Sequence, residues 1–96
     1  MKALPPRLDV SEFIDTPEAE ATLLADAFDS GDIGYITHAL GIIARARGIT
    51  QVARDAGVTR EALYKAFGGS GDPKLSTLLG VMKALGVRIS VQKDAA

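Results

Sequence analysis

The 96-residue sequence predicts an all-α domain of five helices followed by one C-terminal β-strand. Apolar residues recur at helical spacing in segments that glycines separate, and a capping residue precedes each segment. The last apolar segment instead alternates with a period of two. Because 47% of the residues are hydrophobic, a chain of this length should fold around a single core.

The first two helices should lie between Thr16 and Gly48. Thr16 and Pro17 are a typical helix start, with a hydroxyl at the N-cap and proline at the first helical position. Gly31 ends this helix, Asp32 caps the next one, and Gly48 closes it. The predicted core face of the second helix comprises Ile36, Ala39, Leu40, Ile43 and Ala44.

Three shorter helices are expected in the second half of the sequence. They should run from Thr50 to Gly57, from Thr59 to Phe67, and from a cap at Asp72-Pro73 to Gly86. The apolar residues expected to bury the last of these helices are Leu75, Leu78, Leu79, Met82 and Leu85.

The C-terminal strand is predicted over residues 87–92, with Val87, Ile89 and Val91 on one apolar face. A strand cannot stand alone, because its backbone groups need hydrogen-bond partners. We expect it to pair with the same strand of a second copy, which makes a homodimer; the alternative is pairing with residues 8–11. The chain therefore divides into an extended N-terminal arm (1–15), a helical domain (16–86) and the C-terminal strand and tail (87–96).

The composition excludes several classes of protein. Cysteine is absent, so we expect no disulfide and no thiolate metal site, and the single histidine, His38, has no partners for a metal or catalytic site. We therefore expect no enzyme activity, no metal and no cofactor. The sequence also lacks a signal peptide and an apolar run that could span a membrane, which predicts a cytoplasmic protein.

Charge is distributed unevenly along the chain. The formal net charge is −1, which by itself argues against a nucleic-acid-binding protein. Residues 1–32, however, carry two basic and eight acidic residues, a net charge of −6, whereas residues 33–96 carry nine basic and four acidic residues, a net charge of +5. This asymmetry predicts two surfaces with two different partners.

The segment most informative about function spans residues 50–67, the helix-turn-helix TQVARDAGVTREALYKAF. Its two short helices meet at Gly57, which permits the positive φ of a tight turn, and the small Ala53 lets the helices approach each other. In a DNA-binding helix-turn-helix, the second helix enters the major groove with its N-terminus first. The pattern therefore predicts that this protein binds double-stranded operator DNA.

Several outward-facing side chains are the candidate DNA contacts. Arg60 can bind guanine through its planar fork, Glu61 can accept from cytosine N4, and Thr59 suits a phosphate oxygen. The remaining candidates are Tyr64 and Lys65 in the same helix, Gln51 in the preceding helix, and Lys74 in the loop beyond.

The residues of this region resemble a known family of regulators. The C-terminal two-thirds is similar to the Cro/repressor-like helix-turn-helix family, which predicts a repressor-like fold. Ala44-Arg45-Ala46-Arg47-Gly48, the run Thr59 to Phe67 and Ala84-Leu85-Gly86 resemble, more closely, the addiction-module antidote proteins related to HigA. Gln51 precedes Ala53 by fewer residues than the repressor family's glutamine does, so its phosphate contact does not follow from the resemblance.

What this resemblance implies is an antitoxin of a type II toxin–antitoxin system. Such a protein dimerises, represses its own operon by binding the operator, and neutralises a RelE/ParE-like toxin. Two other functions remain open from the sequence. One is a stand-alone phage-like transcriptional repressor, and the other is a protein-binding module without affinity for DNA, which the net negative charge favours.

Overall fold

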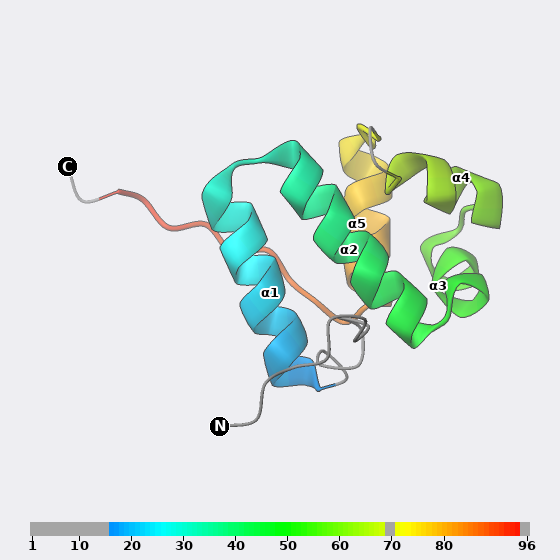
Figure 1. Ribbon diagram of the computed structural model, residues 1–96, viewed down its shortest axis with the longest axis horizontal. Coiled ribbons are helices and arrows are strands. Elements are labelled where there is room, and N and C mark those ends of the chain that lie inside the picture. Colours follow the sequence, from blue (N-terminus) through cyan, green and yellow to red (C-terminus); the bar gives the residue numbers. More distant parts are fainter. Residues whose placement is uncertain (1–15, 69–70, 95–96) are drawn as a thin grey trace, which may run out of the picture.

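The computed structural model describes residues 16–68 and 71–94, and within these ranges it is all-helical. Its five helices are α1 (Pro17–Ser30), α2 (Ile33–Arg47), α3 (Ile49–Ala56), α4 (Arg60–Ala66) and α5 (Leu75–Ala84). In Figure 1, α2 crosses the middle of the molecule, α1 lies on one side of it, α3 and α4 lie on the other, and α5 lies behind it. The prediction of five helices is therefore confirmed, whereas the predicted N-terminal arm lies outside the described residues.

Three of the predicted N-caps are confirmed by their hydrogen bonds. The Thr16 Oγ1 accepts from the Ala19 N–H at 3.1 Å, and the Asp32 carboxylate accepts from the Gly34 N–H at 2.9 Å. The Thr59 hydroxyl accepts from the N–H of Ala62 at 3.0 Å. Each cap satisfies a backbone donor that has no partner inside the helix, so local sequence determines where α1, α2 and α4 begin.

Two predicted helix starts are wrong. Helix α3 begins at Ile49 and not at Thr50, because Gly48 both ends α2 and occupies the N-cap position of α3. Helix α5 begins at Leu75 and not after Asp72, and Lys74 takes its N-cap position with an extended backbone (φ −61°, ψ 153°). Neither helix has a side-chain cap, so the connections on either side fix where they begin.

The hydrophobic core is formed around α2. Its largest fully buried side chains are Leu40 and Ile43 from α2, Leu63 from α4 and Val81 from α5. Helix α5 lies close against α3, where a Cβ atom added at Gly80 would come within 3.3 Å of the Ala56 carbonyl oxygen. Helix α3 packs against α2, α4 and α5, so the core holds α3 and α4 in a fixed orientation.

Part of the predicted apolar face of α5 is not buried. Val81, Met82 and Leu85 are buried as expected, but Leu75 is 67% exposed and Leu79 is 47% exposed. Successive residues of a helix are turned by about 100°, so Leu75 and Leu79 lie one turn apart on a flank that the core does not cover. The apolar surface of α5 is therefore wider than the part that packs in the single chain.

The predicted C-terminal strand is absent: no β-strand occurs among the described residues. Residues 87–94 are irregular, and only Val87 of this segment donates a backbone hydrogen bond to another described residue, the Met82 carbonyl at 2.9 Å. A strand exists only when a second strand completes its ladder of hydrogen bonds, and the described chain provides none. The sequence predicts Val87 on one apolar strand face with Ile89 and Val91. Its side chain instead packs against the core of its own chain.

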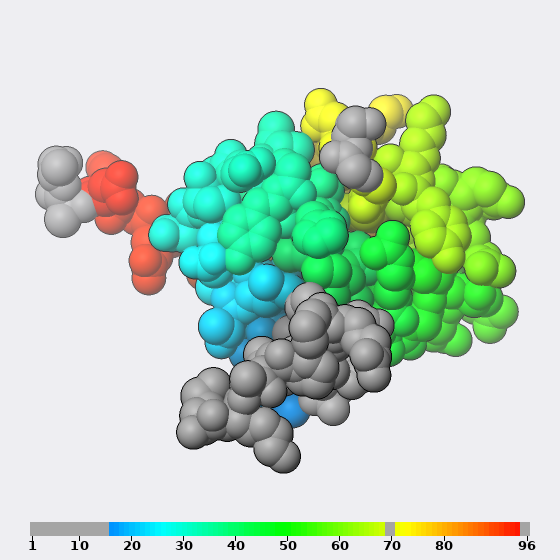
Figure 2. Space-filling view, in the orientation of Figure 1, coloured from blue at the N-terminus to red at the C-terminus, as the bar shows by residue number. Residues whose placement is uncertain are grey.

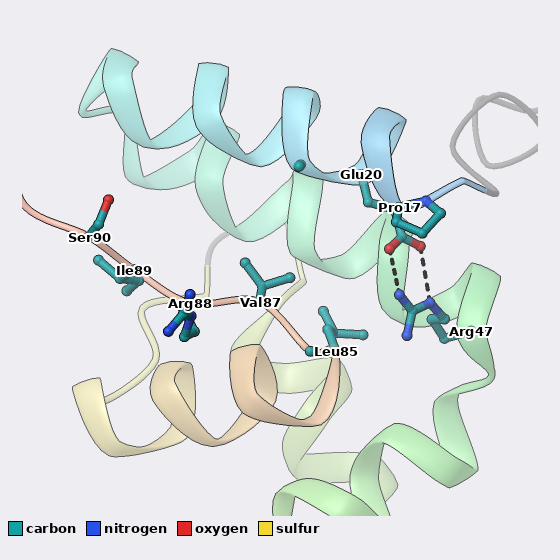
Figure 3. A pocket seen from close by; sticks show the side chains of 10 residues that line it. Pro17, Glu20, Arg47, Leu85, Val87, Arg88, Ile89 and Ser90 are labelled. Carbon is teal, nitrogen blue, oxygen red and sulfur yellow. Dashed lines mark hydrogen bonds and ion pairs between the residues drawn. The ribbon is translucent and has the colours of Figure 1, made fainter.

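An ion pair that the sequence did not reveal joins α1 to α2. The carboxylate of Glu20 is only 4% exposed and accepts two hydrogen bonds from the Arg47 guanidinium, 3.1 Å from Nε and 2.6 Å from Nη2 (Figure 3). The hydrogen bonds to Glu20 raise the pKa of the Arg47 guanidinium above its ordinary value. The pair ties the first turns of α1 to the last turn of α2, immediately before α3 begins.

We expect the two halves of this ion pair to respond unequally to mutation. Arg47→Met leaves a buried carboxylate without a partner and should lower the free energy of unfolding by about 2–3 kcal/mol, less than for a fully buried pair. Glu20→Gln leaves Arg47, whose side chain is 41% exposed, in contact with water, and should cost about 1 kcal/mol. Urea denaturation of both variants measures the difference, and equal losses would contradict it.

Candidate nucleic-acid interface

The turn between α3 and α4 is fixed by backbone geometry. Gly57 has a left-handed backbone (φ 74°, ψ 29°), and its N–H donates to the carbonyl of Arg54 at 3.2 Å. The N–H of Val58 donates to the carbonyl of Ala53 at 2.9 Å, which closes the last turn of α3. Because Ala53 is small and only 3% exposed, the two helices meet closely at this turn.

Helix α4 is held by its buried side and presents the other side to solvent. Leu63 is 1% exposed and Phe67 is 6% exposed, so both are part of the core. Residues four positions apart lie on the same side of a helix, so residues 60 and 64 form one exposed row and residues 61 and 65 form a neighbouring one. The exposed face of α4 consists of these four residues, Arg60, Glu61, Tyr64 and Lys65.

The exposed face of α4 brings different hydrogen-bonding groups together on a surface one helix wide. It offers the guanidinium donors of Arg60, the ammonium of Lys65, the carboxylate of Glu61 and the hydroxyl of Tyr64, which is 45% exposed. In Figure 2, α3 (green) and α4 (yellow-green) form one side of the molecule, away from α1 (blue to cyan). The rest of the described chain thus leaves this face uncovered.

The two remaining candidates lie outside α4. Gln51 is exposed on α3, but its side-chain amide donates to the carboxylate of Asp55 at 2.8 Å. Lys74 is exposed directly before α5. The structure therefore groups Thr59, Arg60, Glu61, Tyr64 and Lys65 in one place, and it adds Gln51 and Lys74 from the neighbouring elements without a contact that joins them to α4.

Helix α1 forms a second charged surface, opposite in sign. Residues 16–32 contain five acidic residues and no basic residue. Glu20 is neutralised by Arg47 and Asp32 caps α2, whereas Glu18, Asp26 and Asp29 are exposed. Asp26 accepts a hydrogen bond from the Tyr35 hydroxyl, which raises the pKa of this tyrosine.

A groove of about 550 Å³ lies between the start of α1 and the segment that follows α5. Pro17 and the Glu20–Arg47 pair line one end of it, and Val87 and Ile89 line the other wall (Figure 3). Among the described residues, no three histidine or acidic side chains are grouped so as to hold a metal ion, and no helix is long and apolar enough to cross a membrane.

The fold and this surface define a small helical protein that presents a short charged helix beyond a tight turn. The chain belongs to a family described as "probable addiction module antidote protein", which it matches over residues 5–93. An uncharacterized protein of Haemophilus influenzae is 45% identical to it over 86 residues, which cover 90% of this chain and 89% of that protein. No solved structure matches the chain. The antidote part of the resemblance is confirmed, whereas the link to HigA and to the Cro/repressor-like fold stays a prediction.

Sequence reasoning missed two features of the site's surroundings. The Glu20–Arg47 pair joins residues 27 positions apart, and no local pattern predicts such a contact. The exposure of Leu75 and Leu79 was also missed, because helical periodicity identifies an apolar face without telling which part of it packs.

We expect Gly57→Ala to destabilise the protein through backbone conformation alone. A Cβ atom at this position would have no atom within 4 Å, but an L-residue at φ 74° is disfavoured by about 1–2 kcal/mol. Gly57→Asn is the matched control, since asparagine tolerates this conformation better, and should lose less stability. Thermal unfolding of the three proteins tests the order, and an alanine variant as stable as wild type would refute it.

Proposed function

We propose that this protein is the antitoxin of a type II toxin–antitoxin system. In this proposal it works in the cytoplasm, binds operator DNA through α3 and α4 as a transcriptional autorepressor, and neutralises a RelE/ParE-like toxin. Membership of the antidote family supports the antitoxin role. The observation that carries the DNA-binding part is the exposed face of α4, which is anchored from behind by Leu63 and Phe67.

The chemistry of this face suits the edges of base pairs. The fork of Arg60 can donate to guanine O6 and N7 together, and the carboxylate of Glu61 can accept from cytosine N4. The hydroxyl of Thr59 accepts from Ala62, which leaves its hydrogen free to donate to a phosphate oxygen. Lys65, one turn along the helix from Glu61, reaches either a base or the backbone.

The net negative charge does not oppose this proposal, because the charges are separated in space. Helix α1, which carries exposed acids, lies across the molecule from α4 (Figure 2), and physiological salt screens exposed charges that are farther apart than about 8 Å. Local charge at the contact, and not the net charge, determines how strongly phosphates are attracted.

We expect Arg60→Ala and Lys74→Ala to weaken DNA binding in different ways. Arg60→Ala should cost about 1–3 kcal/mol for the operator and relax the base preference at one position. Lys74→Ala should weaken all sequences alike and reduce the slope of log affinity against log salt by about one unit. Titrations of operator and unrelated duplexes at two salt concentrations measure both effects, and an Arg60 variant with unchanged operator affinity would remove its assigned role.

The toxin is proposed to bind the acidic surface of the N-terminal third. Carboxylates can take the place of nucleic-acid phosphates on a basic ribonuclease-type protein. Of the acids in this third of the chain, Asp9, Glu12 and Asp15 lie outside the described residues, whereas Glu20 is already paired with Arg47. Exposed Glu18 and Asp29 are the described carboxylates proposed to serve.

We expect charge removal on α1 to separate the two activities. Glu18→Gln combined with Asp29→Asn should weaken binding of the co-expressed neighbouring gene product, with a larger effect at low salt, and leave operator affinity unchanged. Asp72→Asn, which removes an exposed acid beyond α4, is the matched control. Calorimetry measures the toxin affinity of the wild type, the double variant and Asp72→Asn. Equal affinities in these three proteins would overturn this assignment.

Two competing functions make different predictions. A protein-binding module without DNA affinity is favoured by the net charge of −1 and by the engagement of Gln51 with Asp55, and it predicts no retardation of operator DNA at low salt. A stand-alone phage-like repressor predicts operator binding without a toxin. Co-expression with the adjacent gene followed by a pull-down distinguishes the latter from an antitoxin.

A further inference from the structure

The groove between the start of α1 and the segment that follows α5 combines apolar walls with two cationic groups. It is here called the arginine groove, because Arg47 and Arg88 both line it. Its lining also includes apolar Ala21 on α1 and apolar Ile89 on the segment 87–94. In Figure 3, α1 forms one wall, this segment forms the other, and Arg47 lies at one end.

Arg47 keeps a hydrogen-bonding group for the groove although it is paired with Glu20. Its Nε and Nη2 atoms donate to the two carboxylate oxygens, so the third nitrogen, Nη1, is directed away from the pair. The side chain of Arg47 is 41% exposed, whereas that of Glu20 is only 5% exposed. The pair therefore offers donors to the groove, while both of its carboxylate oxygens already accept hydrogen bonds.

Arg88 is the second cationic group, and it gives the groove a net positive charge. Glu20–Arg47 is the one ion pair among the described residues, so Arg88 has no carboxylate partner there. Residues 73–93 contain four basic residues and no acidic one. Exposed Glu18 lines a different hollow of α1 and not this groove. Two arginines thus face one carboxylate, which is already neutralised.

We propose that the arginine groove binds an acidic peptide segment of a partner protein, in which carboxylates alternate with apolar side chains. The apolar side chains of the peptide pack against Ala21, Val87 and Ile89. One carboxylate accepts from Nη1 of Arg47 and another pairs with Arg88, through charge-assisted hydrogen bonds that are stronger than neutral ones. Charge and polarity of the groove together select a segment that is both acidic and apolar.

Other classes of ligand fit the groove less well. Nucleic acid supplies phosphates, but its binding draws on several cations at once and leaves apolar walls without a partner. A small-molecule site buries about 70–90% of its ligand. This groove is more open, since the side chain of Arg47 is 41% exposed and Ile89 is 45% exposed. A peptide lying along an open groove needs to bury only one of its sides.

This binding site is independent of the proposed DNA and toxin contacts. Helix α4 contributes no residue to the groove, so a bound peptide leaves the exposed face of α4 uncovered. The proposed toxin is basic and is expected to contact exposed acids of α1, whereas Arg88 repels a basic partner. The groove therefore serves a third partner, with chemistry opposite to that of the toxin.

Binding of synthetic peptides to the full chain tests the chemistry of the groove. The probe is a short fluorescent peptide in which glutamate alternates with leucine, and two control peptides carry glutamine or lysine in place of glutamate. The glutamate peptide should bind saturably at low salt and more weakly as salt is raised, and the lysine peptide should not bind. Equal binding of all three peptides, or no saturation by the glutamate peptide at the highest soluble protein concentration, would overturn the proposal.

Matched variants locate the peptide on the protein. Arg88→Gln should weaken binding of the glutamate peptide about two- to fivefold, as expected for an exposed ion pair, and Lys83→Gln, outside the groove, should not. Ala21→Gln fills part of the groove and should weaken binding about tenfold or more, because an apolar side chain loses its contact. Ala25→Gln, one turn along α1 and outside the groove, is its control. Circular dichroism shows that each variant is folded, and folded groove variants that bind like their controls would refute the site.

Magnetic resonance distinguishes the remaining occupants. The chain has no cysteine, so a spin label at Ala25→Cys is the single label and should broaden the signals of the bound glutamate peptide. A label at Tyr64→Cys, on α4, should not, and the reverse result would place the peptide on α4. If Arg88→Gln shifts the signals of residues 1–15 in the free protein, the chain's own N-terminal segment fills the groove and the partner assignment is wrong. Displacement of the peptide by acetate at equal carboxylate concentration would likewise overturn it. Absence of operator or toxin binding would instead defeat the proposed function alone.

Discussion

The burial of α2 is the constraint on which the rest of the structure depends. Leu40 and Ile43 are fully buried, α1 and α3 pack directly against α2, and α4 and α5 pack against α3. Gly41 extends this constraint, because a Cβ there would lie 3.2 Å from the carbonyl oxygen of Phe67, so the end of α4 approaches α2 closely. A larger residue at this position would push α4 outward and change the orientation of the surface that it presents.

The same constraint explains how a helix of only seven residues can serve as a rigid surface. Isolated helices of this length are not stable in water, so α4 depends on tertiary contacts for its existence. Its Thr59 cap, the Gly57 turn and the buried Leu63 fix its start, its direction and its rotation. The core therefore holds the exposed face of α4 in a fixed position. The proposed recognition of DNA depends on this rigidity.

Three surfaces with different chemistry are separated in this small protein. The acidic side of α1 carries Glu18 and Asp29, the mixed polar face of α4 carries Arg60, and the uncovered apolar flank of α5 carries Leu75 and Leu79. Because the acidic side of α1 and the exposed face of α4 are separate, the proposed toxin and operator DNA can bind at the same time. The Glu20–Arg47 pair is a direct polar link between α1 and the end of α2, where α3 begins.

The sequence by itself determined the helices whose starts carry a capping side chain, and it identified the outward face of α4, because caps and 3.6-residue periodicity are local properties. It did not determine the starts of α3 and α5, where the connections decide and no side chain caps the helix. Only the tertiary structure decided that Glu20 pairs with Arg47, that Val87 packs inward, and that Leu75 and Leu79 stay exposed. Local pattern shows which residues are apolar or charged, but a contact between distant segments exists only once packing has placed them side by side, and a strand exists only once it has a partner.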